Sequence, residues 1–171
     1  MYAPRSVALI GASARPGAVG NVILSNLLGA GLPGPVWAVN HRGGEILGQQ
    51  VYRDVASLPG VPDLAVIATP PKSVPGLIDE LGRRGTKAAV VITAGFGELG
   101  EEGRALQAQM LAAARPHRLR IAGPNCLGIM SPGAGLNASF GHVQPGKGHV
   151  AVVSQSGAVV TAVRDWATRR G

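Results

Sequence analysis

Short runs of apolar residues alternate along this chain with segments of helical period. The runs lie at residues 7–10, 35–40, 63–68, 87–92 and 119–122. Most of them are continuous rather than alternating, which is typical of strands buried on both faces of a parallel sheet. Between them, apolar side chains three and four residues apart predict helices over residues 19–28, 74–84 and 98–114. The pattern therefore predicts an α/β fold built on a doubly wound, mostly parallel sheet.

A loop rich in Gly, Pro, Ser, Thr or Asn follows each predicted strand. The loops are residues 11–17, 40–44, 69–71, 93–97 and 123–128. In a doubly wound sheet the ligand lies at the carboxyl ends of the strands, which is where these loops are expected. Their side chains can form hydrogen bonds with a phosphate, a ribose or an amide.

The first loop has the arrangement of a phosphate-binding turn. An apolar strand stops at Gly11, and the next helix directs free backbone N–H groups and the positive end of its dipole toward the loop. Glycines stand at positions 11, 17 and 20, but Ser13 occupies the position where the dinucleotide fingerprint G-x-G-x-x-G has its second glycine. The turn alone therefore does not distinguish a nucleotide site from an ordinary strand-to-helix connection.

The end of the chain predicts a second structural unit. After residue 129, a passage rich in glycine, serine and proline indicates a boundary. Residues 149–153 then predict a strand, residues 154–157 a turn and residues 158–170 a helix. One strand and one helix cannot form a domain, so we expect a domain over residues 1–145 and, over residues 146–171, the start of a second, truncated one.

Composition and charge exclude several classes of function. The net charge of +7 comes from 16 basic and 9 acidic residues, but the arginines are scattered and aromatic residues make up only 4%, so no nucleic-acid partner is expected. No apolar run approaches the ~20 residues of a membrane span, and the N-terminus lacks the layout of a signal peptide. A single cysteine permits no internal disulfide, which favours a cytoplasmic location without a membrane partner.

The loop after the second predicted strand narrows the choice of ligand. The acidic residue that would hold the ribose diol of NAD is missing there: Asn40 takes its place, and Arg42 follows. Arg42 suits a phosphorylated ribose, which occurs in both NADP and coenzyme A. The chain has no Walker-type G-K-S/T motif, and its one cysteine and four dispersed histidines predict no metal site.

Five motifs together carry a resemblance to a known family. They are, in chain order, residues 7–13 with 15–17 (VALIGAS, RPG), 39–40 (VN), 93–98 (TAGFGE), 123–128 (GPNCLG) and 154–158 (SQSGA). Over essentially its whole length the chain resembles the acyl-CoA synthetases that form a nucleoside diphosphate. That family includes the α subunits of ADP-forming acetate–CoA ligase and of succinyl-CoA synthetase.

The resemblance implies a Rossmann-type domain that binds coenzyme A, followed by the start of a flavodoxin-like ligase domain. The ADP part of the cofactor is then expected along the glycine-rich turn, its 3′-phosphate near Arg42, its pantetheine along the loops after the third and fourth strands, and its thiol near Cys126. The implied cofactor-binding residues are Gly11, Ser13, Arg15, Pro16, Gly17, Asn40, Arg42, Thr69, Pro70, Thr93, Ala94, Gly95, Asn125 and Cys126.

The same resemblance implies a phosphate site in the second unit, formed by Ser154, Ser156 and Gly157 for the phosphate of a phosphohistidine. Ser154 and Ser156 are also suited to capping the last helix. None of the four histidines matches the family's phosphohistidine motif, which lies beyond residue 171, and an ATP-grasp subunit or domain binds the nucleotide. We therefore expect the chain to bind CoA or acyl-CoA as a part of an ADP-forming acid–CoA ligase that is inactive alone, with no catalytic residue of its own.

Two other functions stay open at this point. Some protein lysine acetyltransferases carry a similar region that senses CoA or acyl-CoA, and the histidine or fused domain that would discriminate them lies outside these residues. An NADP-dependent oxidoreductase domain would share the turn and Arg42. It would also require a catalytic acid–base residue and a substrate domain, which the sequence does not show. The residues do not indicate which acid is the acyl substrate.

Overall fold

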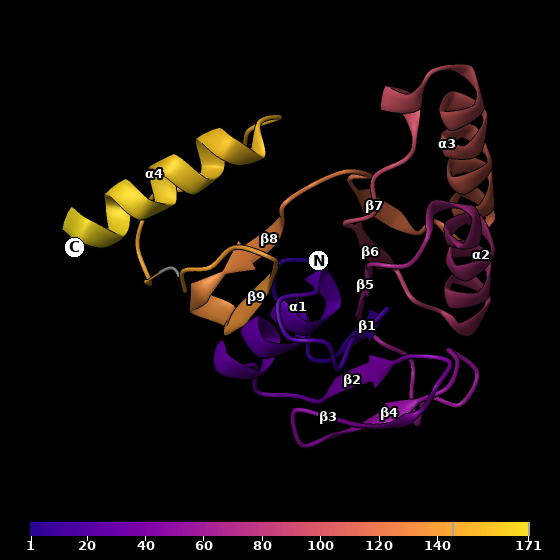
Figure 1. The fold of residues 1–171 in the computed structure, drawn as a ribbon, viewed down its shortest axis with the longest axis horizontal. Helices are drawn as coiled ribbons and strands as arrows, with labels where there is room; N and C mark the ends of the chain where they lie inside the picture. Colours follow the sequence, from indigo (N-terminus) through magenta and orange to yellow (C-terminus); the bar gives the residue numbers. More distant parts are fainter. Residues whose placement is uncertain (145, 171) are drawn as a thin grey trace.

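The computed structural model describes residues 1–144 and 146–170. Its main feature is a seven-stranded sheet in the order β3-β4-β2-β1-β5-β6-β7, in which β3 alone is antiparallel to its neighbour (Figure 1). The strands are β1 (Val7–Ile10), β2 (Val36–Val39), β3 (Gly44–Ile46), β4 (Gln49–Tyr52), β5 (Leu64–Ile67), β6 (Ala88–Val91) and β7 (Arg120–Ala122). The strand order reverses between β1 and β5, as in a doubly wound fold. The predicted α/β fold class is confirmed.

Helices cover both faces of the sheet. Helix α1 (Val19–Gly29) lies on one face, and α2 (Val74–Arg84) and α3 (Glu101–Ala114) lie side by side on the other (Figure 1). Successive residues of β1, β5 and β6 belong alternately to two separate hydrophobic clusters, one on each face. These three strands are completely buried, as their continuous apolar runs predict.

A hairpin of β8 (Gly128–Ser131) and β9 (Leu136–Ser139) completes the layer that contains α1. Leu136 and Ala138 of β9 belong to the hydrophobic cluster of α1. The side chain of Asn26 in α1 adds polar contacts, because its Nδ2 donates to the carbonyl oxygens of Ser139 (2.9 Å) and Gly141 (2.8 Å). The expectation of a loop immediately after residue 129 is therefore wrong, because residues 128–139 form a hairpin whose second strand is buried.

The last helix forms as predicted, but the strand before it does not. Helix α4 (Gly157–Arg170) begins one residue before the predicted position. Residues 150–153 have no regular structure, and Val150 and Val153 are 87% and 95% exposed. The prediction of a strand over residues 149–153 is wrong because a strand needs a neighbour for its N–H and C=O groups, and no described segment pairs with this one.

The start of α3 also differs from its prediction. A separate 3₁₀ turn at Gly97–Leu99 precedes the helix, which begins at Glu101. Leu99, which falls within the predicted helix, is 69% exposed, whereas Phe96 just before the turn is fully buried. In the described part of the chain, no helix combines the length and the apolar character that crossing a membrane requires.

Acid is expected to weaken a contact between α2 and the turn that follows α3. Asp79 accepts hydrogen bonds from Arg83, and its Oδ1 lies 2.9 Å from His117 Nε2. These two contacts, and the one with Arg83 more than the one with His117, lower the pKa of Asp79 from its ordinary value to about 2. Since the folded-state pKa is depressed, the stabilisation is complete above the unfolded pKa and is lost as the pH falls through about 2.

Urea unfolding between pH 5 and pH 2 measures this effect. The free energy of unfolding should fall less steeply with acidification in Asp79→Asn than in the parent chain, since the variant has no carboxylate to protonate. Equal slopes for the two chains would contradict the assignment.

Candidate functional site

The glycine-rich turn lies at the switch point of the sheet. Gly11 ends β1 with a φ of +100°, and a Cβ at this position would lie 2.5 Å from the carbonyl oxygen of Ala68, which follows β5. The N–H groups of Gly11 and Ala12 both donate to the carbonyl of Val39 at the end of β2 (3.0 and 3.1 Å). The turn is therefore held between the carboxyl ends of β2 and β5, where a doubly wound sheet binds its ligand.

The N-terminus of α1 is open to an anion. Its N-cap is Ala18, which has no capping side chain, and the first turn contains no acidic residue. The turn before it keeps its shape through local hydrogen bonds: Ser13 Oγ accepts from the N–H of Arg15 (3.2 Å), and Asn21 Nδ2 donates to the carbonyl of Ser13 (2.9 Å). Arg15, Pro16 and Gly17 are exposed beside it. Free N–H groups and the helix dipole suit this end of α1 to a phosphate.

Asn40 joins the loop after β2 to the glycine-rich turn. Its Nδ2 donates to the carbonyl of Ala12 (2.7 Å), and its Oδ1 accepts from the backbone N–H of Arg42 (2.9 Å). Its own N–H donates to the carbonyl of Tyr52 at the end of β4 (2.9 Å). One half-buried side chain thus fixes the position of the Arg42 backbone relative to the turn.

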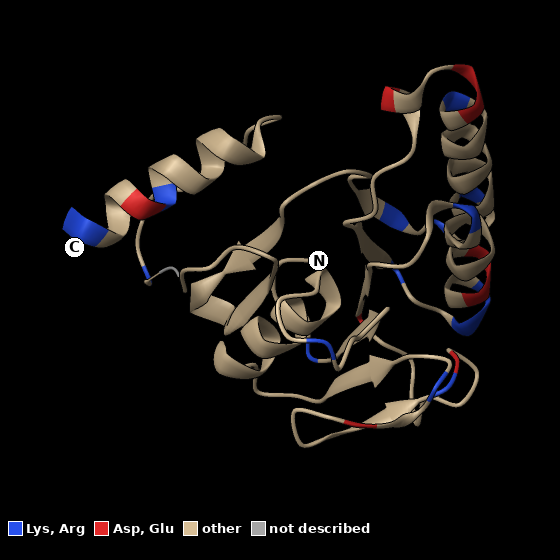
Figure 2. Ribbon diagram, viewed as in Figure 1, with Lys and Arg blue, Asp and Glu red and all other residues tan. Residues whose placement is uncertain are grey.

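A second arginine, which the sequence analysis did not identify, lies in the same place. Arg53 follows β4, and a Cβ at Gly43 would lie 3.2 Å from Arg53 Nε, so the Arg53 side chain lies against the loop that contains Arg42. Basic residues on the loops beyond β2 and β4 are visible in Figure 2. In residues 1–144 and 146–170, neither Arg42 nor Arg53 forms an ion pair with a carboxylate. Two basic residues therefore lie on neighbouring loops at this corner of the sheet.

The loops after β5 and β6 are connected through two threonines. Thr93 Oγ1 donates to the carbonyl of Thr69 (2.7 Å), and Ser73 Oγ donates to Thr69 Oγ1 (2.8 Å). Pro70 and Ala94 are exposed at the surface of these loops. Gly95 has a φ of +105° and its N–H donates to Glu98 Oε1 (2.6 Å), which lowers the pKa of Glu98.

The loop after β7 places Cys126 beside β6. The N–H of Asn125 donates to the carbonyl of Thr93 (2.9 Å), and Cys126 Sγ lies 3.4 Å from the carbonyl oxygen of Val91, to which it donates. Burial raises the pKa of the Cys126 thiol, so it is protonated at neutral pH. A protonated, half-buried thiol is a poor nucleophile, which favours a packing role over covalent chemistry.

The residues predicted to bind a second phosphate cap α4. Ser156 Oγ accepts from the N–H of Val159 (3.3 Å), and Ser154 Oγ accepts from the N–H of Ser156 (3.0 Å). Gly157, the first residue of the helix, lies near the Cys126 loop, since a Cβ at this position would be 3.6 Å from the Cβ of Leu127. Capping uses the same N–H groups that a phosphate would bind, so the observed contacts fit both roles.

The predicted residues thus form one group at the carboxyl edge of the sheet. The glycine-rich turn, the Asn40 loop and the loops after β5, β6 and β7 are connected to each other by hydrogen bonds. The turn at residues 154–157 reaches this edge through Leu127. Arg53 was missed because it follows a short hairpin, β3 and β4, that the sequence pattern did not predict. The signal for it in the sequence was the pair Val51-Tyr52, which is followed by a basic residue.

Known proteins similar to the chain are described as binding or using coenzyme A. The family described as "CoA binding domain" matches residues 5–132. The α subunit of ADP-forming acetate–CoA ligase I from Pyrococcus furiosus is 44% identical over 170 residues, which are 97% of this chain and 37% of that subunit. The chain therefore spans well under half the length of this relative.

Two solved structures have the same fold. A crystal structure of a Pyrococcus horikoshii protein matches with a TM-score of 0.93 and 38% identity, over 99% of this chain and 38% of that one. The apo form of a "dinucleotide forming" acetyl-coenzyme A synthetase 1 from Candidatus Korarchaeum cryptofilum matches with a TM-score of 0.90 and 38% identity, over 99% of this chain and 36% of that one.

Proposed function

The chain belongs to the CoA-binding domain family, and on this premise we propose that it holds coenzyme A non-covalently at the carboxyl edge of the sheet. The observation that carries the proposal is the chemistry of the corner between β1 and β2. There, the uncapped N-terminus of α1 lies next to a loop that has Asn40 in place of an acidic residue, together with two arginines free of carboxylates in the described residues. This corner suits a ligand with a diphosphate and a phosphorylated ribose, and coenzyme A has both.

Coenzyme A is a long molecule, so we assign its successive parts to successive loops along the edge of the sheet. We assign the diphosphate to Gly11, Ser13, Arg15, Pro16 and Gly17, and the 3′-phosphate to Arg42 and Arg53, with Asn40 positioning this loop. The pantetheine arm would follow Thr69, Pro70, Thr93, Ala94 and Gly95, and the thiol would end near Asn125 and Cys126. The hydrogen bonds that join these loops support a continuous path along the edge of the sheet.

In the whole protein, we propose that the chain is the CoA-binding part of an acid–CoA ligase that forms ADP. The Pyrococcus relative of that name supports this proposal. The phosphate of a phosphohistidine from outside these residues would meet Ser154, Ser156 and Gly157, and an ATP-grasp partner would bind the nucleotide. Residues 1–145 and 146–171 would then belong to two different domains, the second of which begins with α4 and the segment before it.

Isothermal titration of the chain with CoA, dephospho-CoA and NADPH tests the cofactor assignment. CoA should bind, dephospho-CoA should bind more weakly, and NADPH should bind least. Binding of NADPH without binding of CoA would contradict the proposal and favour an oxidoreductase domain.

Single substitutions of the two arginines test the 3′-phosphate assignment. Arg42→Ala and Arg53→Ala should each lower the affinity for CoA by about tenfold, because each removes a hydrogen bond between charged groups. The affinity for dephospho-CoA should stay nearly unchanged. Arg5→Ala is the control: it removes the same charge before β1, at the opposite edge of the sheet, where Arg5 faces Asp63. Equal losses for both ligands in Arg42→Ala would refute the assignment.

A further inference from the structure

Arg164 is an unusual residue of α4. It is the one buried residue of this helix, and its side chain is only 6% exposed. Its Nε and Nη2 donate to Oδ1 of the neighbouring Asp165 (3.1 and 2.9 Å). Its Nη1 is buried without a hydrogen-bond partner among the described residues. Arginine is seldom buried, so the position of this side chain requires an explanation.

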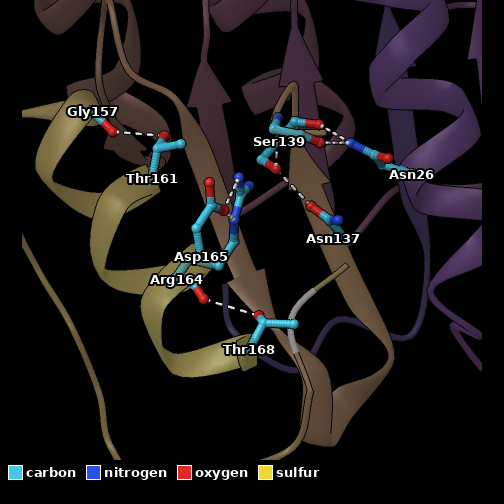
Figure 3. Close-up of polar contacts among 9 residues, drawn as sticks. Asn26, Asn137, Ser139, Gly157, Thr161, Arg164, Asp165 and Thr168 are labelled. Atoms are coloured by element: carbon cyan, nitrogen blue, oxygen red, sulfur yellow. Dashed lines mark hydrogen bonds and ion pairs between the residues drawn. The ribbon is translucent and has the colours of Figure 1, made fainter. Parts of the chain in front are cut away.

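The guanidinium of Arg164 occupies a space that exists because residue 141 is glycine. A Cβ at Gly141 would overlap Arg164 Nη1, and it would lie 3.5 Å from Ser139 Oγ. We call this space, beside Gly141 and Ser139, the Gly141 notch. Figure 3 shows Arg164 of α4 directed toward the hairpin strand that contains Ser139. The guanidinium is therefore the part of α4 that docks against the hairpin.

The Gly141 notch is fixed to the helix that carries the first anion site. Asn26 Nδ2 in α1 donates to the carbonyl oxygens of Ser139 and Gly141, and Ser139 Oγ donates to Asn137 Oδ1 (2.6 Å) while accepting from the N–H of Gly141 (3.3 Å) (Figure 3). A chain of contacts thus leads from α1 through Asn26 and the hairpin to Arg164. The N-terminus of α1 is open to one phosphate, and the N-terminus of α4 is the second anion site proposed above.

Helix α4 meets the rest of the chain at a second point, its first residue. Gly157 lies against Leu127 of the loop that contains Cys126, and Arg164 lies seven residues further along the helix. Seven residues are two turns, or roughly 10 Å of helix. Two contacts at this separation determine both where the helix begins and which way it points.

We propose that Arg164 is a positioning residue, which docks α4 in the Gly141 notch and thereby holds the turn of residues 154–157 beside the loop of residues 123–127. This proposal rests on the proposed function, since it concerns the distance between the second phosphate site and the expected position of the CoA thiol. Arg164 is the one buried residue of α4, whereas Val160 and Val163 of the same helix are only half-buried, so Arg164 is the side chain of α4 most enclosed by the rest of the chain.

A disulfide cross-link reports whether α4 is docked. The Cβ positions of residues 127 and 157 are 3.6 Å apart, within the range that a disulfide requires. In the full chain carrying Cys126→Ala, we therefore introduce Leu127→Cys and Gly157→Cys and follow oxidation in a glutathione buffer by mass spectrometry. This reporter chain should cross-link rapidly, whereas absence of a cross-link would overturn the proposal.

Four further variants of the reporter chain separate docking from helix stability. Arg164→Met keeps an unbranched side chain but removes the guanidinium, and Gly141→Val fills the notch from the opposite side. Each should slow cross-linking by about tenfold or more, because each removes the packing of the guanidinium against Gly141. The double variant should be no slower than either single one, because both remove the same contact. Asp165→Asn is the control: it loses the ion pair within the helix but leaves Arg164 in the notch, so its rate should stay close to that of the reporter.

Two results would contradict the proposal. One is an Asp165→Asn rate as slow as that of Arg164→Met, which would reduce Arg164 to a helix-stabilising residue. The other is an unchanged rate in both Arg164→Met and Gly141→Val. Titration of the Arg164→Met chain with CoA, with Cys126 and Leu127 intact, distinguishes a failure of the docking proposal from a failure of the proposed function. Its affinity should equal that of the parent chain, whereas failure of the parent chain to bind CoA would count against the proposed function and not against the docking of α4.

Discussion

Gly20→Ala should destabilise the chain by about 3 kcal/mol and lower its Tm by about 10 °C. Gly20 is buried in the first turn of α1, where an added Cβ would overlap the carbonyl oxygen of Gly11 and lie 3.3 Å from the carbonyl carbon of Ala12. Neither backbone atom can retreat easily, because the N–H groups of Gly11 and Ala12 are held by the carbonyl of Val39. The substitution must therefore push α1 away from the glycine-rich turn.

The same displacement should reduce CoA binding by more than the loss of stability explains. The proposed diphosphate site consists of the turn and the N-terminus of α1, and Gly20 sets the distance between them. Thermal unfolding and calorimetry below the Tm of the variant measure the two effects separately.

Gly76→Ala is the matched control for Gly20→Ala. Gly76 also lies near the start of a helix, α2, but no atom lies within 4 Å of a Cβ at this position and the residue is exposed. Alanine has the higher helix propensity, so this variant should be unchanged or more stable by up to about 1 kcal/mol. A Gly20→Ala chain as stable as Gly76→Ala would show that the close approach of α1 to the turn is not needed.

The central sheet could be predicted because its signal is local. The strands at residues 7–10, 64–67 and 88–91 are buried on both faces, so every position is apolar and the run itself identifies the strand. The hairpin of β8 and β9 gave no such signal. It includes Asn137 and Ser139, which are buried polar residues satisfied by partners such as Gln144. The hydrogen bonds that satisfy these buried polar residues, including the one from Asn26 to the carbonyl of Ser139, cannot be read from the periodicity of the sequence.

In the candidate site, too, local sequence patterns predicted some features, whereas contacts between segments determined others. The loops at the carboxyl ends of the strands were predicted from their position after each apolar run, and the structure joins them at one edge. Arg53 lay outside that prediction, because its place beside Arg42 depends on the parallel pairing of β2 with β4. For residues 149–153 the sequence predicted an element that does not form. The apolar residues of this segment suit a strand, but a strand also needs a neighbouring strand, which composition does not show.

Asn40→Asp should weaken CoA binding by about 10- to 100-fold, more than the loss of either arginine alone. The new carboxylate would retain the hydrogen bond from the N–H of Arg42, but its second oxygen would face the carbonyl of Ala12, to which Asn40 Nδ2 now donates. It would also place a negative charge in the corner where we assign the 3′-phosphate. The first effect loosens the turn, and the second repels the ligand.

Asn40→Ala separates these two effects, because it removes the link to Ala12 without adding a charge. We expect Asn40→Ala to weaken the binding of CoA and the binding of dephospho-CoA by the same factor. Asn40→Asp should weaken the binding of CoA by a larger factor than the binding of dephospho-CoA. The extra loss in Asn40→Asp should shrink as salt is added from about 0.05 to 0.5 M, since repulsion between partly exposed charges is screened. If both variants show the same ratio of CoA to dephospho-CoA affinity at every salt concentration, the 3′-phosphate lies elsewhere, and the positive charge of Arg42 and Arg53 has another purpose.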